Sequence, residues 1–256
     1  DDYAETKAIS ENFGAFYDQM KVVDDSRAEF VSNVSHELKT PLTSMKVLAD
    51  SINMMGDEAP IEMYREFMGD ITSEIDHEND IINELLSLVR LDKAKGELSI
   101  SPVNMNELLE ILLKRLQPIA SQQKVELVLE SFRPVTAEID EIQFSLAIMN
   151  LIENAIKYNN EGGWVHVSLN SDHQYCFIRV EDNGMGIPED SLDRIFERFY
   201  RADKSHSRQI AGTGLGLAIT HDAIVLHHGE IRVSSIEGEG TTFDVRLPLK
   251  YIKETA

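Results

Sequence analysis

The chain has 256 residues, of which 45 are acidic and 24 are Lys or Arg, giving a formal net charge of −21 at pH 7. An acidic surface repels phosphate backbones and anionic lipid, which argues against charge-driven binding to nucleic acid or membrane surfaces. Hydrophobic residues make up 42% of the chain, enough to build cores and to exclude wholesale disorder. Cys176 is the lone cysteine, and no stretch approaches the roughly 20 apolar residues of a spanning helix. We therefore expect one or two domains with cytosolic chemistry, no nucleic-acid partner and no direct membrane contact within this segment.

Residues 3–91 have the apolar spacing of three and four that is typical of long helices. One apolar stripe is formed by Phe30, Val34, Leu38, Leu42, Met45, Ala49 and Ile52, and another by Tyr64, Phe67, Ile71, Ile75, Ile82, Leu85 and Val89. Between the stripes, residues 56–60 read Gly-Asp-Glu-Ala-Pro, which predicts a short turn and an antiparallel hairpin. Because two helices alone bury such stripes poorly, we expect a homodimer in which two hairpins form a four-helix bundle.

After residue 95, short strand-like and helical segments alternate. Strands are predicted at residues 125–130, 135–139, 164–169, 175–181, 229–235 and 242–247. Helices are predicted at residues 104–122, 140–158, 188–196 and 213–227. This order predicts an α/β sandwich, with helices over one face of a largely antiparallel sheet. The predicted organisation is a helical linker over residues 1–25, a hairpin domain over 26–95 and an α/β domain over 96–256.

His36 lies two residues from both Val34 and Leu38, which places it about 200° around the helix from the apolar stripe. An exposed histidine without a special role is the plain alternative. The neighbours favour chemistry, because the Glu37 carboxylate can hold one ring nitrogen while the other attacks phosphorus. Thr40 lies one turn away on the same face, and Pro41 removes a backbone donor and is expected to kink the helix.

The helix predicted at residues 140–158 carries a polar stripe opposite its apolar one. The polar stripe consists of Asn150, Asn154, Lys157 and Tyr158. A solvated surface accounts for such a stripe equally well. Amide oxygens, however, are hard ligands suited to Mg²⁺, and a lysine one turn on can contact phosphate.

Two glycine-containing segments suit a nucleotide. Asp182 ends a predicted strand before Gly184 and Gly186, and although turn formation explains half of this pattern, the carboxylate can also accept from the exocyclic amine of adenine. The run from Gly212 to Leu217 opens a helix and offers N–H groups to phosphate. Its spacing matches neither a Rossmann nor a Walker A motif. The polar segment 200–211 before it suits a mobile lid.

These segments resemble sensor histidine kinases. The sequence His36-Glu37-Leu38-Lys39-Thr40-Pro41 is similar to the phosphoacceptor motif of the HisKA type. Residues 150–158, 182–188, 196–201, 212–217 and 238–242 resemble the N, G1, F, G2 and last glycine boxes of the GHKL ATP-binding superfamily. The resemblance covers about residues 26–249, and His228 departs from it by standing where the family usually has glycine. Residues 9–20 look like the closing helix of a HAMP module.

The resemblance implies a dimeric helical hairpin followed by an α/β sandwich of the GHKL (Bergerat) type. It implies that His36 is autophosphorylated, that Glu37 is its general base, and that Thr40 positions water for dephosphorylation of a response-regulator partner. ATP and Mg²⁺ are the implied cofactors, with Asn154 and Asn150 as metal ligands. The implied nucleotide-binding residues are Asn150, Asn154, Lys157, Tyr158, Asp182, Gly184, Gly186, Arg201, Gly212, Thr213, Gly214, Leu215, Gly216 and Thr241. The segment is then expected to be the cytoplasmic portion of a bacterial inner-membrane sensor.

Two alternatives remain open. An ATPase of the gyrase kind would use the same pocket to drive conformational change, but it would need a carboxylate where this chain has Asn150, and it would leave His36 unexplained. A non-catalytic dimeric signalling scaffold would not need His36, Asn154 and Asp182 to be intact.

Overall fold

A computed structural model describes residues 2–55, 59–94, 98–202 and 212–252 of the chain. It divides into two compact units, residues 1–81 and residues 82–256. Some predicted features lie outside the described residues. They are residues 56–58 of the turn predicted at residues 56–60, the predicted domain boundary at residue 95, and residues 203–211, which are most of the predicted lid. The side chains of residues 9–20, the segment that resembles a HAMP helix, are not described either.

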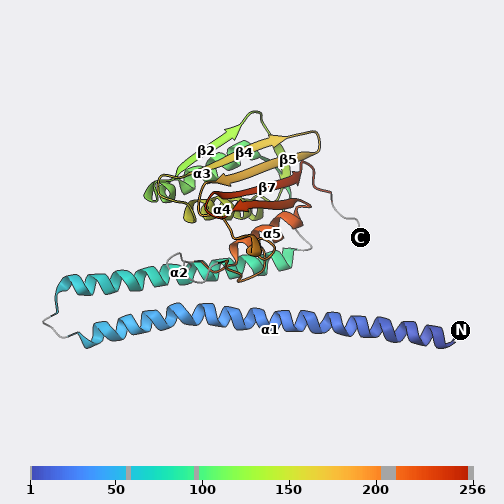
Figure 1. Cartoon of the computed structure of the whole chain (residues 1–256), viewed down its shortest axis with the longest axis horizontal. Helices are drawn as coiled ribbons and strands as arrows, with labels where there is room; N and C mark the ends of the chain where they lie inside the picture. Colours follow the sequence, from blue (N-terminus) through green and yellow to red (C-terminus); the bar gives the residue numbers. More distant parts are fainter. Residues whose placement is uncertain (1, 56–58, 95–97, 203–211, 253–256) are drawn as a thin grey trace. The chain divides into compact units, whose positions relative to one another are not determined.

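The first unit is a helical hairpin, as predicted (Figure 1). Helix α1 (Asp2–Met54) contains Pro41 in its interior, and α2 (Ile61–Ala94) returns antiparallel to it. Among the described residues, Tyr64 Oη donates to the Met55 carbonyl at 3.4 Å, and Ser44 Oγ donates to Glu74 at 3.2 Å. These contacts connect α2 to α1 and to the residue that follows it. None of the described helices combines the length and the apolar character needed to cross a bilayer.

The prediction that all residues of the two apolar stripes face inward is partly wrong. Leu42 is 55% exposed whereas the adjacent Pro41 is buried, and Ile75 is 47% exposed. On a helix of 3.6 residues per turn, the three successive steps of four residues from Phe30 to Leu42 rotate by about 120°, so the stripe read on α1 merged an inner face with a second, outer one. The outer apolar side chains of the two helices include Val31, Leu42, Val47, Met68, Ile75, Ile82, Leu86 and Val89.

The second unit is built on a five-stranded sheet in the order β2-β4-β5-β7-β6. Its strands are β2 (Glu126–Ser131), β4 (Trp164–Ser171), β5 (Tyr175–Asp182), β6 (Glu230–Ile236) and β7 (Gly240–Pro248). Strands β2 and β4 run parallel, and the other three neighbouring pairs are antiparallel. The alternation of buried and less buried side chains along β4 and β7 shows that one face of this sheet is covered.

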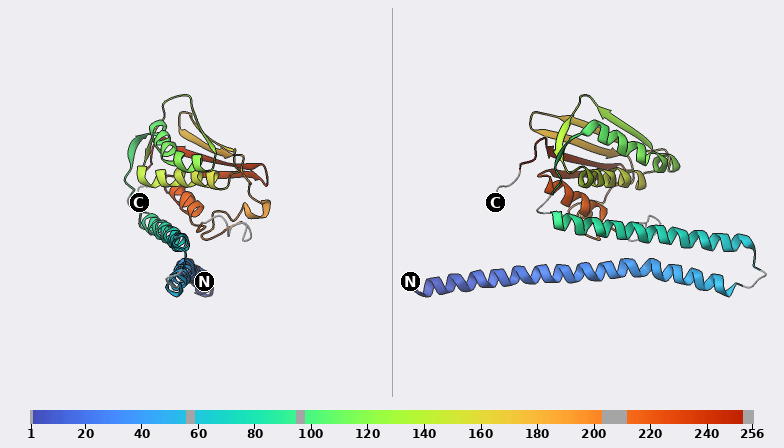
Figure 2. Two further views of the ribbon diagram at one scale, coloured as in Figure 1. Left: turned by 90° about the vertical axis from the view of Figure 1, so that its left-hand side faces the viewer. Right: turned by 180° about the vertical axis from the view of Figure 1, so that it is seen from behind.

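Three helices cover that face (Figures 1 and 2). They are α3 (Met105–Gln122), α4 (Glu141–Lys157) and α5 (Gly216–Leu226). Asparagine and aspartate caps start the first two, because the side chains of Asn104 and Asp140 accept backbone N–H groups of the first helical turn. The helices bury large apolar side chains against the sheet, among them Phe144, Ile148 and Leu151, each with 0% exposure. The predicted α/β sandwich is therefore confirmed.

Three details differ from the prediction. Residues 188–196 form a short 3₁₀ turn, Glu189–Ser191, followed by irregular turns rather than a helix. The final helix begins at Gly216 rather than at residue 213. An unpredicted strand, β1 (Ser101–Asn104), pairs with β3 (Thr136–Ile139) in a separate two-stranded sheet. Pro102 weakens the strand pattern there, and β1 is only four residues long.

Candidate functional site

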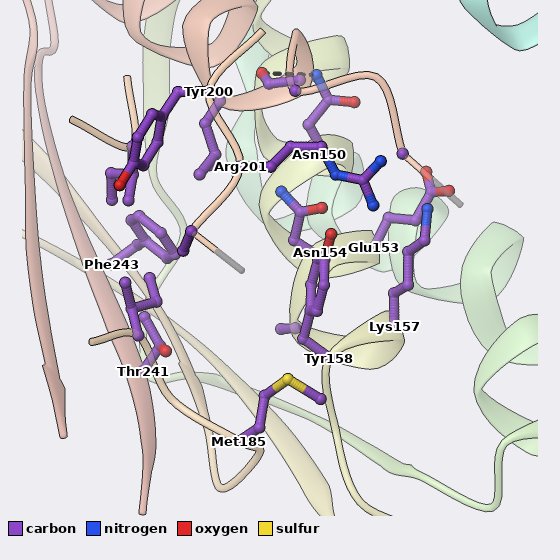
Figure 3. Close-up of a pocket in the computed structure, with 18 of the residues that line it drawn as sticks. Asn150, Glu153, Asn154, Lys157, Tyr158, Met185, Tyr200, Arg201, Thr241 and Phe243 are labelled. Atoms are coloured by element: carbon purple, nitrogen blue, oxygen red, sulfur yellow. Dashed lines mark hydrogen bonds between the residues drawn. The ribbon is translucent and has the colours of Figure 1, made fainter. Parts of the chain in front are cut away.

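A pocket of about 510 Å³ lies between α4, the loop after β5, the segment before α5, and β7 (Figure 3). Among the described residues, the structure brings most of the predicted nucleotide-binding residues into its lining. These are Asn150, Asn154, Lys157, Tyr158, Asp182, Gly186, Arg201, Gly212, Thr213, Gly214, Gly216 and Thr241. Segments that are far apart in sequence therefore form one site.

Helix α4 presents its polar stripe to this pocket (Figure 3). The opposite stripe, including Leu151 and Ile152, is fully buried, and this fixes the rotation of the helix. Asn150 Nδ2 donates to the Gly216 carbonyl at 3.2 Å, which ties α4 to the first turn of α5. The Oδ1 atom of Asn150 is then left for a ligand, next to Asn154 one turn further on. This pair of amide oxygens fits a hard divalent cation such as Mg²⁺.

Asp182 forms the floor of the pocket at the end of β5 and is 9% exposed. Its Oδ1 accepts the Gly184 N–H at 2.8 Å. Burial raises the pKa of Asp182 to about 6, although backbone N–H donors from Gly184 and Thr241 oppose that shift. The carboxylate is therefore ionised at neutral pH but close to protonation in mild acid.

The two glycines after Asp182 let the chain pass close to other backbone segments. A Cβ on Gly184 would clash with the carbonyl oxygen of Tyr158, and a Cβ on Gly186 would clash with that of Ile236. Gly186 also has a φ of +68°, a conformation that favours glycine. Gly184 thus supports the loop from behind and, unlike Gly186, does not line the pocket.

The opposite end of the pocket is formed by the segment 212–216 together with Lys157 and Arg201 (Figure 3). A Cβ added to Gly212 would lie 3.7 Å from Lys157 Nζ, so an ammonium group stands next to this backbone. Leu215 is fully buried and its N–H donates to Thr213 Oγ1 at 3.1 Å, so it packs behind the segment and does not line the pocket. A cationic, N–H-rich wall of this kind suits phosphate groups.

Several lining residues were missed from the sequence. Glu153 lies between the two asparagines on α4, and Met185, Tyr200 and Phe243 form apolar walls (Figure 3). Phe243 follows the inward alternation of β7 and reads as an ordinary core residue. Tyr200 lies in the irregular segment before residue 203, where no periodic pattern assigns a direction to a side chain.

In the first unit, His36 lies on the outside of α1, as predicted. Its side chain is 81% exposed, and Nδ1 is 3.8 Å from Glu37 Oε1. Thr40 Oγ1 donates to the His36 carbonyl at 3.1 Å, so the threonine hydroxyl stands one turn along the same exposed face. An imidazole with a carboxylate beside Nδ1 keeps Nε2 as its available nucleophile.

Comparisons with known proteins agree with both parts. Residues 26–94 match the His Kinase A (phospho-acceptor) domain, and residues 139–251 match the histidine kinase-, DNA gyrase B-, and HSP90-like ATPase family. Sensor histidine kinase WalK of Bacillus subtilis (strain 168) is 35% identical in an alignment of 243 positions that covers 92% of this chain but 39% of that protein.

Two solved structures are also similar. The mycobacterial sensor histidine kinase MprB has 29% identity and a TM-score of 0.52, over 60% of this chain and 99% of that one. Full-length ShkA in complex with AMPPNP has 28% identity and a TM-score of 0.64, over 88% of this chain and 46% of that one. With a phosphoacceptor domain followed by an ATPase-type domain, the chain belongs to the sensor histidine kinases.

Proposed function

We propose that this chain uses ATP and Mg²⁺ to phosphorylate its own His36 and then passes the phosphoryl group to an aspartate of a response regulator. The observation that carries the proposal is the presence in one chain of an exposed His36–Glu37 pair and a nucleotide-sized pocket. The similar protein ShkA was solved with AMPPNP, which supports an adenine nucleotide in the pocket. The domains proposed for these roles are residues 26–95 and 96–256, after a helical linker over residues 1–25.

The base would bind at the Asp182 end of the pocket. The ionised carboxylate accepts a hydrogen bond from the exocyclic amine of adenine, whereas guanine presents an oxygen there and would be repelled. Gly186 brings backbone close to the base, and Met185 supplies an apolar surface (Figure 3). The pocket therefore favours adenine over guanine.

The triphosphate would extend toward Lys157, Arg201 and the backbone of residues 212–216. Mg²⁺ fits the amide oxygens of Asn154 and Asn150, and when bound it would neutralise charge on the phosphates. The remaining contribution of these residues is placement, because Lys157 and Arg201 hold oxygens that gain charge as the γ-phosphoryl group leaves. The planar Arg201 guanidinium carries several N–H donors and suits this role.

The phosphoacceptor step uses His36 and Glu37. Glu37 holds the proton on Nδ1, and the lone pair of Nε2 attacks the γ-phosphorus. The new Nε2–P bond forms as the bond from γ-phosphorus to the bridging oxygen breaks, and ADP leaves with that electron pair. Alignment of nucleophile, phosphorus and leaving oxygen supplies much of the rate acceleration.

The proposed partners follow from the surfaces of the hairpin. The outer apolar side chains of α1 and α2, such as Leu42 and Ile75, favour a homodimer of two hairpins. A receiver domain would dock on the exposed face of His36, where Thr40 would orient a water molecule for dephosphorylation of the phosphoaspartate. The segment would act on the cytoplasmic side of a membrane sensor.

The test is incubation with γ-labelled ATP, followed by acid and alkali treatment of the protein. Label that is lost in acid and stable in alkali identifies phosphohistidine, and His36→Gln should abolish it while ATP affinity stays near normal. An ATPase of the gyrase kind would release labelled phosphate without labelling the protein. A non-catalytic scaffold would bind ATP and do neither. Label retained in His36→Gln would contradict the assignment of the phosphoacceptor.

A further inference from the structure

Ser235 interrupts an apolar row at the edge of the pocket. Ile231, Val233 and Ser235 follow one another at the spacing of two that places them on the same side of β6. In the β6–β7 register, Ser235 lies opposite Thr241, which lines the pocket. Ser235 itself is not part of the lining. A third apolar side chain would continue the row, so the hydroxyl at this position needs a specific explanation.

The Ser235 hydroxyl makes three polar contacts. It accepts the N–H of Ile187 at 2.8 Å and donates to the carbonyl of Gly240 at 2.8 Å. Its oxygen also lies 2.9 Å from Thr241 Oγ1. A hydroxyl has one hydrogen, and the Gly240 carbonyl can only accept, so the hydrogen between the two hydroxyls belongs to Thr241. Ser235 thereby fixes the direction of the Thr241 hydroxyl, which donates its hydrogen to Ser235 and keeps its lone pairs for accepting.

These contacts join the parts of the chain that surround the proposed adenine position. Thr241 lies opposite Asp182 in the β5–β7 register, and its N–H is one of the donors that act on that carboxylate. Ile187 directly follows Gly186, and the Met185 carbonyl accepts the Gly238 N–H at 2.8 Å. The Ser235 hydroxyl therefore connects the loop after Asp182 to the start of β7, and the Met185 carbonyl connects that loop to the turn between β6 and β7.

We infer that Ser235 is a positioning residue for adenine recognition, acting through Thr241 and the Ile187 backbone and without touching the nucleotide. The inference rests on the proposed binding of ATP in this pocket. Without the Ser235 hydroxyl, the Thr241 hydroxyl is free to rotate, and the loop after Asp182 loses its hydrogen bond at Ile187. The part of ATP that would be affected is the exocyclic amine, because Asp182 and Thr241 stand at that end of the site.

Ser234 provides a matched control. It is the preceding residue of the same strand, it is exposed, and it lies opposite Thr242 rather than Thr241. Ser235→Ala and Ser234→Ala therefore remove the same hydroxyl group from neighbouring positions of one strand. The nucleotides to compare are ATP and purine riboside triphosphate, which lacks the exocyclic amine. Their dissociation constants are measured by calorimetry for the wild-type chain and each variant.

We expect Ser235→Ala to weaken ATP binding about tenfold, which is the loss typical of one or two hydrogen bonds. Binding of the analogue should weaken much less. Preference for ATP over the analogue should thus fall in Ser235→Ala and persist in Ser234→Ala. Equal weakening of both nucleotides, or unchanged ATP binding, would overturn the inference. Wild-type protein that binds neither nucleotide would instead contradict the proposed function.

A second pair of variants covers the case in which Ser235→Ala does not fold. Ser235→Thr and Ser235→Val have nearly the same shape and differ in the hydroxyl, so any effect of the added methyl group is common to both. Retained preference for ATP in the threonine variant and loss in the valine variant would support the inference. In addition, Thr241→Val combined with Ser235→Ala should weaken ATP binding no more than the stronger single change. Independent, additive losses would show that Ser235 does not act through Thr241.

Discussion

The buried carboxylate of Asp182 should make the nucleotide-free protein less stable than it would be with a neutral side chain there. The relevant change is Asp182→Asn, which keeps an oxygen that can accept the Gly184 N–H. The change removes the negative charge of Asp182, a residue that is 9% exposed at the end of β5. We expect the variant to be more stable at pH 8 and to bind ATP far more weakly, so that stability and binding change in opposite directions.

The pKa of Asp182 sets the magnitude. Burial raises it from 3.8 to about 6, a difference that corresponds to about 3 kcal/mol against the ionised form above pH 6. The full amount is an upper limit, because the pocket is open to water and the asparagine amide must itself be taken out of water. We therefore expect the free energy of unfolding to rise by about 1–2 kcal/mol at pH 8.

The pH dependence gives the sharper check. Since the folded pKa of Asp182 is raised, the penalty is fully present above about pH 6 and disappears as the pH falls toward 3.8. The advantage of the variant, measured by urea unfolding at pH 8, 7, 6 and 5, should therefore shrink below about pH 6. ATP affinity of the wild-type chain should fall over the same range as the carboxylate protonates. A variant that is no more stable at pH 8, or an advantage that does not change with pH, would refute this reasoning.

Three further predictions concern single residues. Asn154→Asp should impair metal-dependent ATP binding, because it adds charge beside the triphosphate; unchanged binding in calorimetry with Mg²⁺ would remove Asn154 from the site. Thr40→Ala should leave labelling of His36 near normal and slow the decay of a phosphorylated response regulator; equal loss of both activities would show that Thr40 supports the helix instead. His228→Gly should raise the free energy of unfolding by about 0.5 kcal/mol, because a φ of +57° costs a residue with a Cβ more than glycine loses in chain entropy. A lower midpoint in urea would indicate that the ring contact of His228 with Tyr251, at 5.0 Å, outweighs that strain.

The polar residues that line the pocket on α4 and at the end of β5 could be singled out because their types are unusual for their positions. Asn150 and Asn154 are amides on a helix whose other face is apolar, and Asp182 ends a buried strand. Such residues break the pattern of a core, and the break is visible locally. His36 was found in the same way, since a helix places it opposite the apolar stripe.

The conformation of residues 188–200 was not predictable from spacing, because side chains hold it. Tyr200 Oη donates to Ser191 Oγ at 3.1 Å, and the Arg194 guanidinium lies 4.3 Å from the centre of the Tyr200 ring. Side-chain contacts of this kind stabilise turns rather than a helix, and the spacing of apolar residues in the sequence does not predict them. The inner and outer faces of the hairpin were confused for a different reason. Both faces are apolar, so one sequence pattern contains two interfaces.

The support behind the site was missed because it joins residues distant in sequence. His227 is 2% exposed; its Nε2 accepts the Asp140 N–H at 3.0 Å and its Nδ1–H donates to the Ala223 carbonyl at 2.7 Å. Burial lowers the pKa of His227, so the ring stays neutral and keeps one acceptor and one donor nitrogen. This ring connects the C-terminal end of α5 to the N-terminal cap of α4. Those two helices also meet through Asn150 at the pocket, so α5 is held at both ends and α4 at its N-terminus and near its middle. In sequence, His227 and Ser235 read as minor interruptions of apolar segments, and only the fold brings them to the partners that explain them.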